Sequence, residues 1–231
     1  MFLLPRTPEP ELMDEAEQAI AYAQADFSIP HNQFIDLFRA TFGDLPVDGT
    51  VLDVGCGPAD VTMRFARAYP DCHIDGVDGA PAMLALGRTS IETAGLSRRV
   101  RLIEGYLPGA VLPRTDYDVV LSNSLLHHLS DPQVLWETVR HHGKPGAAVF
   151  IMDLRRPDTS EEIETLVRLH AAGEPEILQR DFQHSLHAAY RPEEVRRQLN
   201  QAGLQELTVN AIGDRHMIIF GHCPATARPS R

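Results

Sequence analysis

The pattern of apolar and polar positions changes at about residue 50, where short runs rich in β-branched residues begin to alternate with segments of helical length. Such runs, without strict alternation of polar residues, are typical of strands that are buried on both faces. Alternation of strand and helix predicts a parallel sheet covered by helices on both sides. The predicted strands are TVLDV (50–54), HIDGV (73–77), VRLIE (100–104), YDVVLS (117–122) and AAVFIMD (147–153), and the predicted intervening helices cover 58–69, 81–94 and 132–142.

Before and after this region the pattern is different. Apolar residues recur at helical spacing in 11–25 and 31–40, with a break at Ser28, Ile29 and Pro30, so residues 1–44 are predicted to form an N-terminal helical cap. Residues 45–223 form the expected main domain, with further helices at 160–171, 174–187 and 192–202. Gly213 and Asp214 separate the runs LQELTVNAI and RHMIIFGH, which predicts a hairpin and therefore an antiparallel last strand. The tail, residues 224–231, is expected to be disordered.

Composition and charge limit the classes of partner. The formal net charge is -11, from 21 basic and 32 acidic side chains, which disfavours nucleic acid. The apolar start is too short for a signal peptide, and no stretch approaches the roughly 20 apolar residues of a membrane helix. The three cysteines show neither a disulfide framework nor metal-like spacing. We therefore expect a cytoplasmic protein, monomeric or homodimeric, with no membrane partner.

The segment VLDVGCGPAD (51–60) carries the first chemical signal. In an open α/β sheet, ligands bind beyond the carboxyl ends of the strands, and this segment follows the first strand. Gly55 and Gly57 would allow close approach of a ligand to the backbone. A dinucleotide site is the alternative, but the third glycine of that motif is replaced by Asp60. Asp53 instead suits a cationic ligand group, such as an ammonium or a sulfonium.

A second acid ends the next predicted strand, in HIDGVDGAPAM. Asp78 lies close to the roughly 20 residues beyond the glycines at which a ribose-binding acid is expected. Asp75 is the alternative in the same segment, although its position three residues earlier places it inside the strand. We therefore predict that Asp78 binds a pair of ribose hydroxyls.

Four segments in order, VLDVGCGPAD, HIDGVDGAPAMLALGR, YDVVLSNSLLHHLSDP and GKPGAAVFIMDL, resemble the class I S-adenosylmethionine-dependent methyltransferases of the small-molecule type. The resemblance covers about residues 45–155. It implies an α/β fold with a Rossmann-like, seven-stranded mixed sheet, a reversed last strand and helices on both faces. It also implies S-adenosylmethionine as the cofactor.

The resemblance assigns roles to individual residues. The methionine part of the cofactor is expected near Asp53, Gly55, Gly57 and Asn123, the ribose at Asp78 and Gly79, and the adenine near Ala80, Met83 and Gly105. One position departs from the family pattern. Where many relatives have Gly-Asp after the third strand, this chain has Gly105 followed by Tyr106, so the adenine is expected to stack on Tyr106 or to contact a neighbouring backbone amide.

Methyl transfer is a displacement at a sulfonium carbon, for which the enzyme mainly aligns the reacting atoms. A thiolate or neutral amine attacks unaided, whereas a hydroxyl or an ammonium needs a base. His127 and His128 are the candidates, and since helical neighbours point about 100° apart, at most one is expected to face the substrate. The resemblance favours His127 as the catalytic base, with Asn123 beside the methyl group. The alternative is one histidine packed in the core and the other solvated.

Several other residues are expected at the methyl acceptor. Asp181 and His184 lie in a polar and aromatic helical segment, and Tyr22 and Phe27 in the cap are expected to pack or to act as a lid, with His128 as a further contact. No metal site is predicted, because His184 and its neighbour one turn later lack a third ligand. The predicted function is methyl transfer to a small molecule. The alternatives are a noncatalytic cofactor-binding module with a protein partner and an RNA methyltransferase.

Overall fold

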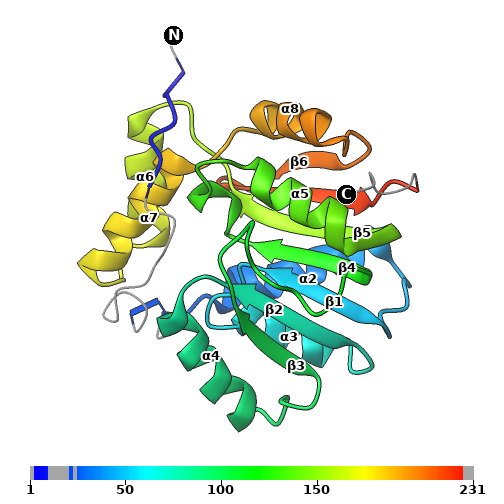
Figure 1. Cartoon of the computed structure of the whole chain (residues 1–231). Coiled ribbons are helices and arrows are strands. Elements are labelled where there is room, and N and C mark those ends of the chain that lie inside the picture. Colours follow the sequence, from blue (N-terminus) through cyan, green and yellow to red (C-terminus); the bar gives the residue numbers. More distant parts are fainter. Residues whose placement is uncertain (1–2, 10–20, 23–24, 226–231) are drawn as a thin grey trace.

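The computed structural model describes residues 3–9, 21–22 and 25–225, and the architecture is a seven-stranded sheet with helices on both faces (Figure 1). The strand order is β3-β2-β1-β4-β5-β7-β6. The first five strands are parallel, and β7 is antiparallel to both of its neighbours. The strands are β1 (Thr50–Val54), β2 (His73–Asp78), β3 (Val100–Glu104), β4 (Tyr117–Asn123), β5 (Gly143–Leu154), β6 (Thr208–Ile212) and β7 (His216–His222).

This sheet confirms the predicted Rossmann-like fold with a reversed last strand. The predicted strand centres agree with the structure, and the main difference is β5, which begins four residues earlier than predicted. The glycine and proline at its start, Gly143 and Pro145, are poor strand formers, which explains the late predicted start. The turn at Gly213 separates β6 from β7 as expected.

The helices of the described residues fall into three groups. Those on one face of the sheet are α2 (Ser28–Phe42), α3 (Asp60–Ala68) and α4 (Pro81–Thr93), and those on the other are α5 (Gln133–His142) and α8 (Pro192–Ala202). The third pair, α6 (Ser160–His170) and α7 (Glu176–Ala188), packs together beside the sheet (Figure 1, left). A short 3-10 helix, η1 (Leu126–His128), follows β4.

Helix α2 packs directly on the sheet, although its sequence was assigned to the cap. Phe34 and Phe38 are completely buried and contact the ring of Phe150 on β5 edge to face, at centroid distances of 5.0 and 5.6 Å. The helix begins at Ser28, where the sequence predicted a break. A proline in the first turn does not interrupt a helix, because its missing N–H would have no partner there. The predicted helix over 11–25 lies largely outside the described residues, as do residues 226–231 of the predicted tail.

The N-terminal strap, which we define as residues 3–9, crosses the helices beside the sheet. The N–H groups of Leu4 and Thr7 each donate to a backbone carbonyl, of Asp158 and His187 respectively, at 3.0 Å. The guanidinium of Arg6 donates to the carbonyl of His127 at 2.9 Å and lies 4.1 Å from the centroid of the Tyr190 ring. The strap is therefore fixed next to η1.

Candidate active site

A large pocket lies at the carboxyl ends of the parallel strands, where the strand order reverses between β1 and β4. This is the position at which open α/β sheets bind ligands. The cavity has a volume of about 760 Å³. Its walls come from the ends of β1, β2, β4 and β5, from α2, α6 and α7, and from the β6–β7 turn.

The glycine turn after β1 forms one wall. Gly55 has φ +73°, and a Cβ there would lie within 2.9 Å of the Leu125 side chain, so both conformation and space require glycine. The N–H of Gly57 donates to Oδ2 of Asp78 at 2.8 Å, while Oδ1 of Asp78 accepts from the N–H of Ala80 at 2.8 Å. The Asp78 carboxylate thus holds two loops together at the pocket wall. Burial raises its pKa, and these backbone N–H groups partly oppose the effect.

Asp53 is the second acid of the pocket and is 2 % exposed. Its carboxylate accepts a hydrogen bond from Oγ1 of Thr62 at 2.6 Å, and it has no basic partner within the described part of the chain. Burial raises the pKa of Asp53 to about 6, and the charge of Asp78 adds to the rise. A buried carboxylate without a cation favours a positively charged ligand group.

The structure places the alternative acid, Asp75, away from the pocket. Asp75 accepts hydrogen bonds from the hydroxyl of Tyr117 and from the guanidinium of Arg101, both at 2.8 Å, and it does not line the cavity. Asp75 is thus a partner of two side chains in the sheet, whereas Asp78 faces the ligand space.

The residues expected at the adenine also line the cavity. They are Gly79, Ala80, Met83, Gly105 and Tyr106. Ala80 and Met83 are buried and form a small apolar cluster. Tyr106 is 50 % exposed, so its ring lies at the rim of the pocket.

Asn123 ends β4 and lies on the same wall as the acids. Its Nδ2 donates to Oγ of Ser124 at 3.3 Å, whereas its buried Oδ1 has no hydrogen-bond partner in the described part of the protein. Ser124 has φ +56°, a left-handed conformation that is unusual for a serine and redirects the chain into η1. A buried acceptor without a partner is costly unless a ligand supplies a donor.

His127 is buried and is oriented by Asp153 at the end of β5. Its Nδ1 lies 2.6 Å from Oδ1 of Asp153. The same Oδ1 accepts the N–H of Leu154, and Oδ2 accepts the N–H of Leu126, each at 2.7 Å. The carboxylate can only accept, so Nδ1 carries a proton, and in the neutral imidazole Nε2 presents a lone pair. Burial lowers the pKa of His127, but Asp153 and then Glu9 outweigh this effect, and the pKa is raised.

Both adjacent histidines line the pocket, so the expectation that at most one could face it is wrong. Their ring centroids are 4.3 Å apart. They lie in a single three-residue turn of η1, where the angular spacing of a long α-helix does not apply. Both rings approach Glu9 of the strap: its Oε1 lies 3.6 Å from Nε2 of His127 and 3.3 Å from Nδ1 of His128.

Only some of the residues expected at the methyl acceptor line the pocket. Tyr22, Phe27 and Asp181 line the pocket, and the rings of Tyr22 and Phe27 lie 4.7 Å apart. Burial raises the pKa of Tyr22 to about 12, so its hydroxyl stays protonated at neutral pH. His184 is exposed on α7 and does not line the cavity, because the inward face of α7 there carries Asp181, Phe182 and Ser185.

Two residues of this site were not found from the sequence. Asp153 follows the rule that located Asp53 and Asp78, an acid at the end of a strand, and could have been identified in this way. Glu9 has no comparable signal, since it is one of several acids in an N-terminal segment far from η1 along the chain.

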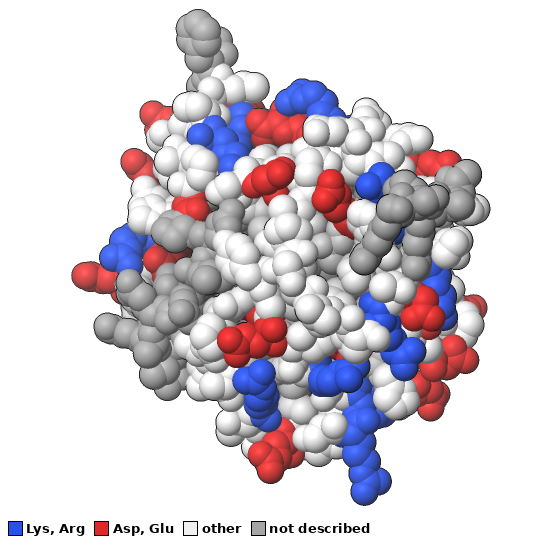
Figure 2. Space-filling view, viewed as in Figure 1, with Lys and Arg blue, Asp and Glu red and all other residues white. Residues whose placement is uncertain are grey.

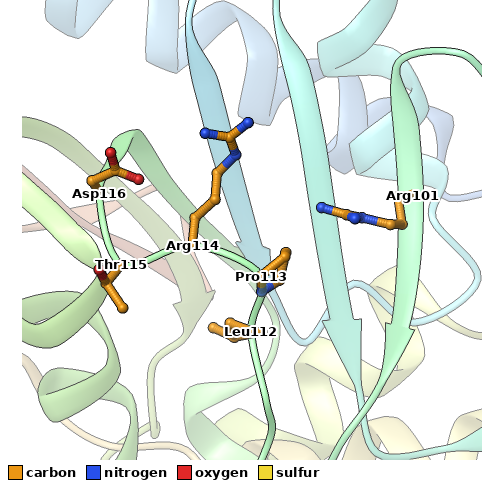
Figure 3. A pocket seen from close by; sticks show the side chains of 6 residues that line it. All are labelled: Arg101, Leu112, Pro113, Arg114, Thr115 and Asp116. Atoms are coloured by element: carbon orange, nitrogen blue, oxygen red, sulfur yellow. The ribbon is translucent and has the colours of Figure 1, made fainter.

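A second hollow lies at the opposite ends of the strands (Figure 3). It is formed by Arg101 at the start of β3 and by residues 112–116, which precede β4. Its guanidinium and carboxylate groups are exposed, and none of the predicted site residues belongs to it. The candidate chemistry is therefore confined to the large cavity.

The surface shows no extended basic region on the face in Figure 2, where basic and acidic side chains are interspersed. Among the described residues, no helix is both long and apolar enough to cross a bilayer.

The sheet order, the reversed β7 and the position of the cavity define the class I methyltransferase architecture. A solved structure with this fold, Haemonchus contortus phosphoethanolamine N-methyltransferase 2 in complex with S-adenosyl-L-methionine, superposes with a TM-score of 0.70 at 15% identity, covering 92% of this chain and 58% of that one. At this identity the likeness concerns the fold.

Sequence comparison then identifies the family. Residues 51–146 match the family described as "Methyltransferase domain". Trans-aconitate 2-methyltransferase of Mycobacterium ulcerans is 35% identical over 96 residues, which span 40% of this chain and 33% of that protein. Release factor glutamine methyltransferase of Rhodopirellula baltica is 30% identical over 133 residues, 58% of this chain and 43% of that protein. Residues 51–146 therefore carry a methyltransferase domain, and each of the two matches spans less than half the length of the curated relative.

Proposed function

We propose that this protein transfers a methyl group from S-adenosylmethionine to a small-molecule acceptor. The observation that carries the proposal is that one cavity contains a buried acid, Asp53, and a partly buried acid, Asp78, beside the glycine turn, together with a histidine oriented by a third acid. The acids suit a ligand with a cationic end and a ribose, and the histidine suits a proton-transfer step.

The residues of the cavity fit this cofactor. Asp53 is a buried carboxylate without a basic partner in the described residues, and Asn123 offers a buried acceptor without a donor. Both are suited to the ammonium or sulfonium groups. Asp78 is suited to the ribose hydroxyls, and the left-handed turn at Gly55 lies beside it in the wall of the same cavity. When bound, the cofactor supplies an electrophilic methyl carbon on a positively charged sulfur.

The chain's own contribution is orientation and proton transfer. Asp53, Asp78 and Asn123 would hold the donor so that its methyl group points toward η1. His127, whose Nδ1 proton is held by Asp153, would accept the acceptor's proton at Nε2 as the nucleophile attacks. Tyr22, Phe27 and Asp181 would close the acceptor side and exclude water.

The form of the cavity supports a small acceptor. Its walls come from the strand ends, from α2, from α6 and α7 and from the β6–β7 turn, so a donor and a compact acceptor can be enclosed together. The names of the two curated relatives specify different methyl acceptors. One is a small acid, trans-aconitate, and the other is a glutamine of a release factor. The net charge of -11 makes an RNA acceptor less favourable.

Methyl transfer can be tested without knowing the acceptor. The protein is incubated with a cell extract and S-adenosylmethionine carrying a deuterated methyl group, and small metabolites are compared by mass spectrometry. A labelled product that requires the protein is the expected result. Cofactor binding with no labelled small molecule in several extracts would favour the noncatalytic module instead. A label found only in protein or RNA would contradict the small-molecule acceptor.

The pKa of Asp53 predicts a pH dependence of cofactor binding. Since the carboxylate has a pKa of about 6 without a ligand, it is mostly protonated at pH 5, and binding a cation there must first ionise it. The affinity should therefore fall by up to about tenfold per pH unit below pH 6 and level off between pH 7 and 7.5. Calorimetry from pH 5 to 7.5 measures this slope.

Asp53→Asn is the matched variant for this prediction. It should bind more weakly at pH 7 and lose part of the slope, leaving the smaller contribution of Asp78, whose pKa is also raised by burial. An unchanged slope in Asp53→Asn would assign the pH dependence to another group.

A further inference from the structure

The Glu9 carboxylate and the two histidines of η1 form a compact set of metal-ligating atoms. One ligand atom from each of Glu9, His127 and His128 can be chosen so that all three lie within 4.8 Å of one another. All three side chains are largely buried. The exposed fraction is 9 % for Glu9, 3 % for His127 and 14 % for His128. Two imidazole nitrogens and one carboxylate oxygen are the ligand set of open, three-residue zinc sites.

The distances fit coordination better than direct hydrogen bonding. Oε1 of Glu9 lies 3.6 Å from Nε2 of His127 and 3.3 Å from Nδ1 of His128, both beyond the usual 2.7–3.2 Å of an N–H···O bond. Ligands about 2.0–2.2 Å from a tetrahedral ion are separated by about 3.3–3.6 Å. Oε1 is buried and accepts no hydrogen bond from the described residues.

The groups around these atoms fix two of the three ligands. Asp153 holds the Nδ1 proton of His127, which directs the Nε2 lone pair toward Glu9, and a carboxylate in this role is typical behind a metal-binding histidine. Oγ of Ser185 donates to Oε2 of Glu9 at 3.2 Å and leaves Oε1 for a ligand. The strap holds Glu9 in place through Arg6, which donates to the carbonyl of His127.

The local charge also favours a cation. Burial is the main cause that raises the pKa of Glu9; His127 and Ser185 oppose it, and the charges of Asp153 and Asp181 add to it. The nearby guanidinium of Arg6 is engaged by backbone carbonyls. The charges of Asp153 and Asp181 therefore act at the Glu9 carboxylate in the sense that favours a bound cation.

We propose that Glu9, His127 and His128 form a binding site for a divalent transition-metal ion, with zinc as the best fit. Because His127 and His128 line the cavity, the remaining coordination position faces the acceptor side. If the proposed methyl transfer is correct, a metal there would take up the Nε2 lone pair of His127 and polarise the acceptor atom in its place. Metal binding itself does not depend on the proposed transfer.

The test is direct metal binding by the full-length protein after removal of metals with a chelator. Equilibrium dialysis with Zn²⁺ should give one tightly bound ion per chain, and titration with Co²⁺ should give the intense visible absorption of a four-coordinate site. Glu9→Gln and His128→Gln should each weaken binding by about 10²-fold, and Asp153→Asn by about 10- to 100-fold.

His141→Gln is the matched control, because this partly exposed histidine lies on α5 and its ring forms a hydrogen bond with the carbonyl of Glu137 in the same helix. It should bind the ion as the wild type does. Circular dichroism and thermal melting of the metal-free variants establish that each is folded. No tight ion in the wild type, or equal binding by folded Glu9→Gln and His128→Gln, overturns the proposal. Neither result bears on methyl transfer, which the labelling experiment tests separately.

Discussion

Replacing Asp78 with alanine should weaken the binding of S-adenosylmethionine by about 10²- to 10⁴-fold. A carboxylate that accepts two ribose hydroxyls contributes about 1.5–3 kcal/mol for each hydrogen bond, and each 1.4 kcal/mol corresponds to a factor of ten. The same carboxylate accepts the N–H groups of Gly57 and Ala80, so its loss also loosens the glycine turn. Calorimetric titration with the cofactor measures the effect.

Two further variants separate cofactor binding from folding. Asp78→Asn keeps one acceptor oxygen but replaces the other with an amide donor, so its cofactor affinity should lie between those of the wild type and Asp78→Ala. Asp75→Asn is the matched control: it should lower thermal stability through Tyr117 and Arg101 while leaving cofactor affinity unchanged. Wild-type affinity in a folded Asp78→Ala protein would contradict the proposed ribose contact.

Replacing His127 with glutamine should lower the rate of methyl transfer by about 10²- to 10⁴-fold, the usual range for removal of a general acid–base group. Cofactor affinity should change by no more than a few fold, because the acids at the glycine turn remain. The rate is measured on the acceptor found by deuterium labelling, at saturating cofactor. An increase in KM for the acceptor with kcat unchanged would indicate that His127 contributes only to acceptor binding.

Asp153 provides the companion test of orientation. In Asp153→Asn the new amide can donate to Nδ1, which would move the imidazole proton to Nε2 and remove the lone pair from the pocket side. The transfer rate should therefore fall although His127 is intact. The control variant is His141→Gln, which replaces a partly exposed histidine on α5 and should leave the rate unchanged. Equal rates in wild type and Asp153→Asn would exclude this positioning role.

Much of the cofactor end of the site could be predicted from the sequence. An acid or a glycine directly after a parallel strand must lie at one edge of the sheet, so Asp53, Gly55 and Asp78 were located by counting along the chain. The choice of Asp78 over Asp75 followed from the same rule, and the structure agrees in placing only Asp78 at the cavity.

The acceptor end could not be predicted to the same extent. His184 was chosen for its residue type, but which face of a helix points inward depends on how α7 packs beside the sheet. The two histidines of η1 converge because a short turn follows a left-handed serine, a feature that helical periodicity does not describe. Glu9 reaches them only because the strap is tied down by long-range hydrogen bonds.

The sequence by itself determined the alternation of strands and helices, the reversed β7, the glycine turn and the acids that follow β1 and β2. These features depend on local backbone preferences and on the regular spacing of strand ends. Both can be predicted from the order of residues along the chain. Only the tertiary structure decided that α2 packs on the sheet, that Asp153 orients His127, and that Glu9 meets both histidines of η1. Those contacts join segments far apart in the chain, and packing of the whole molecule is what brings them within reach.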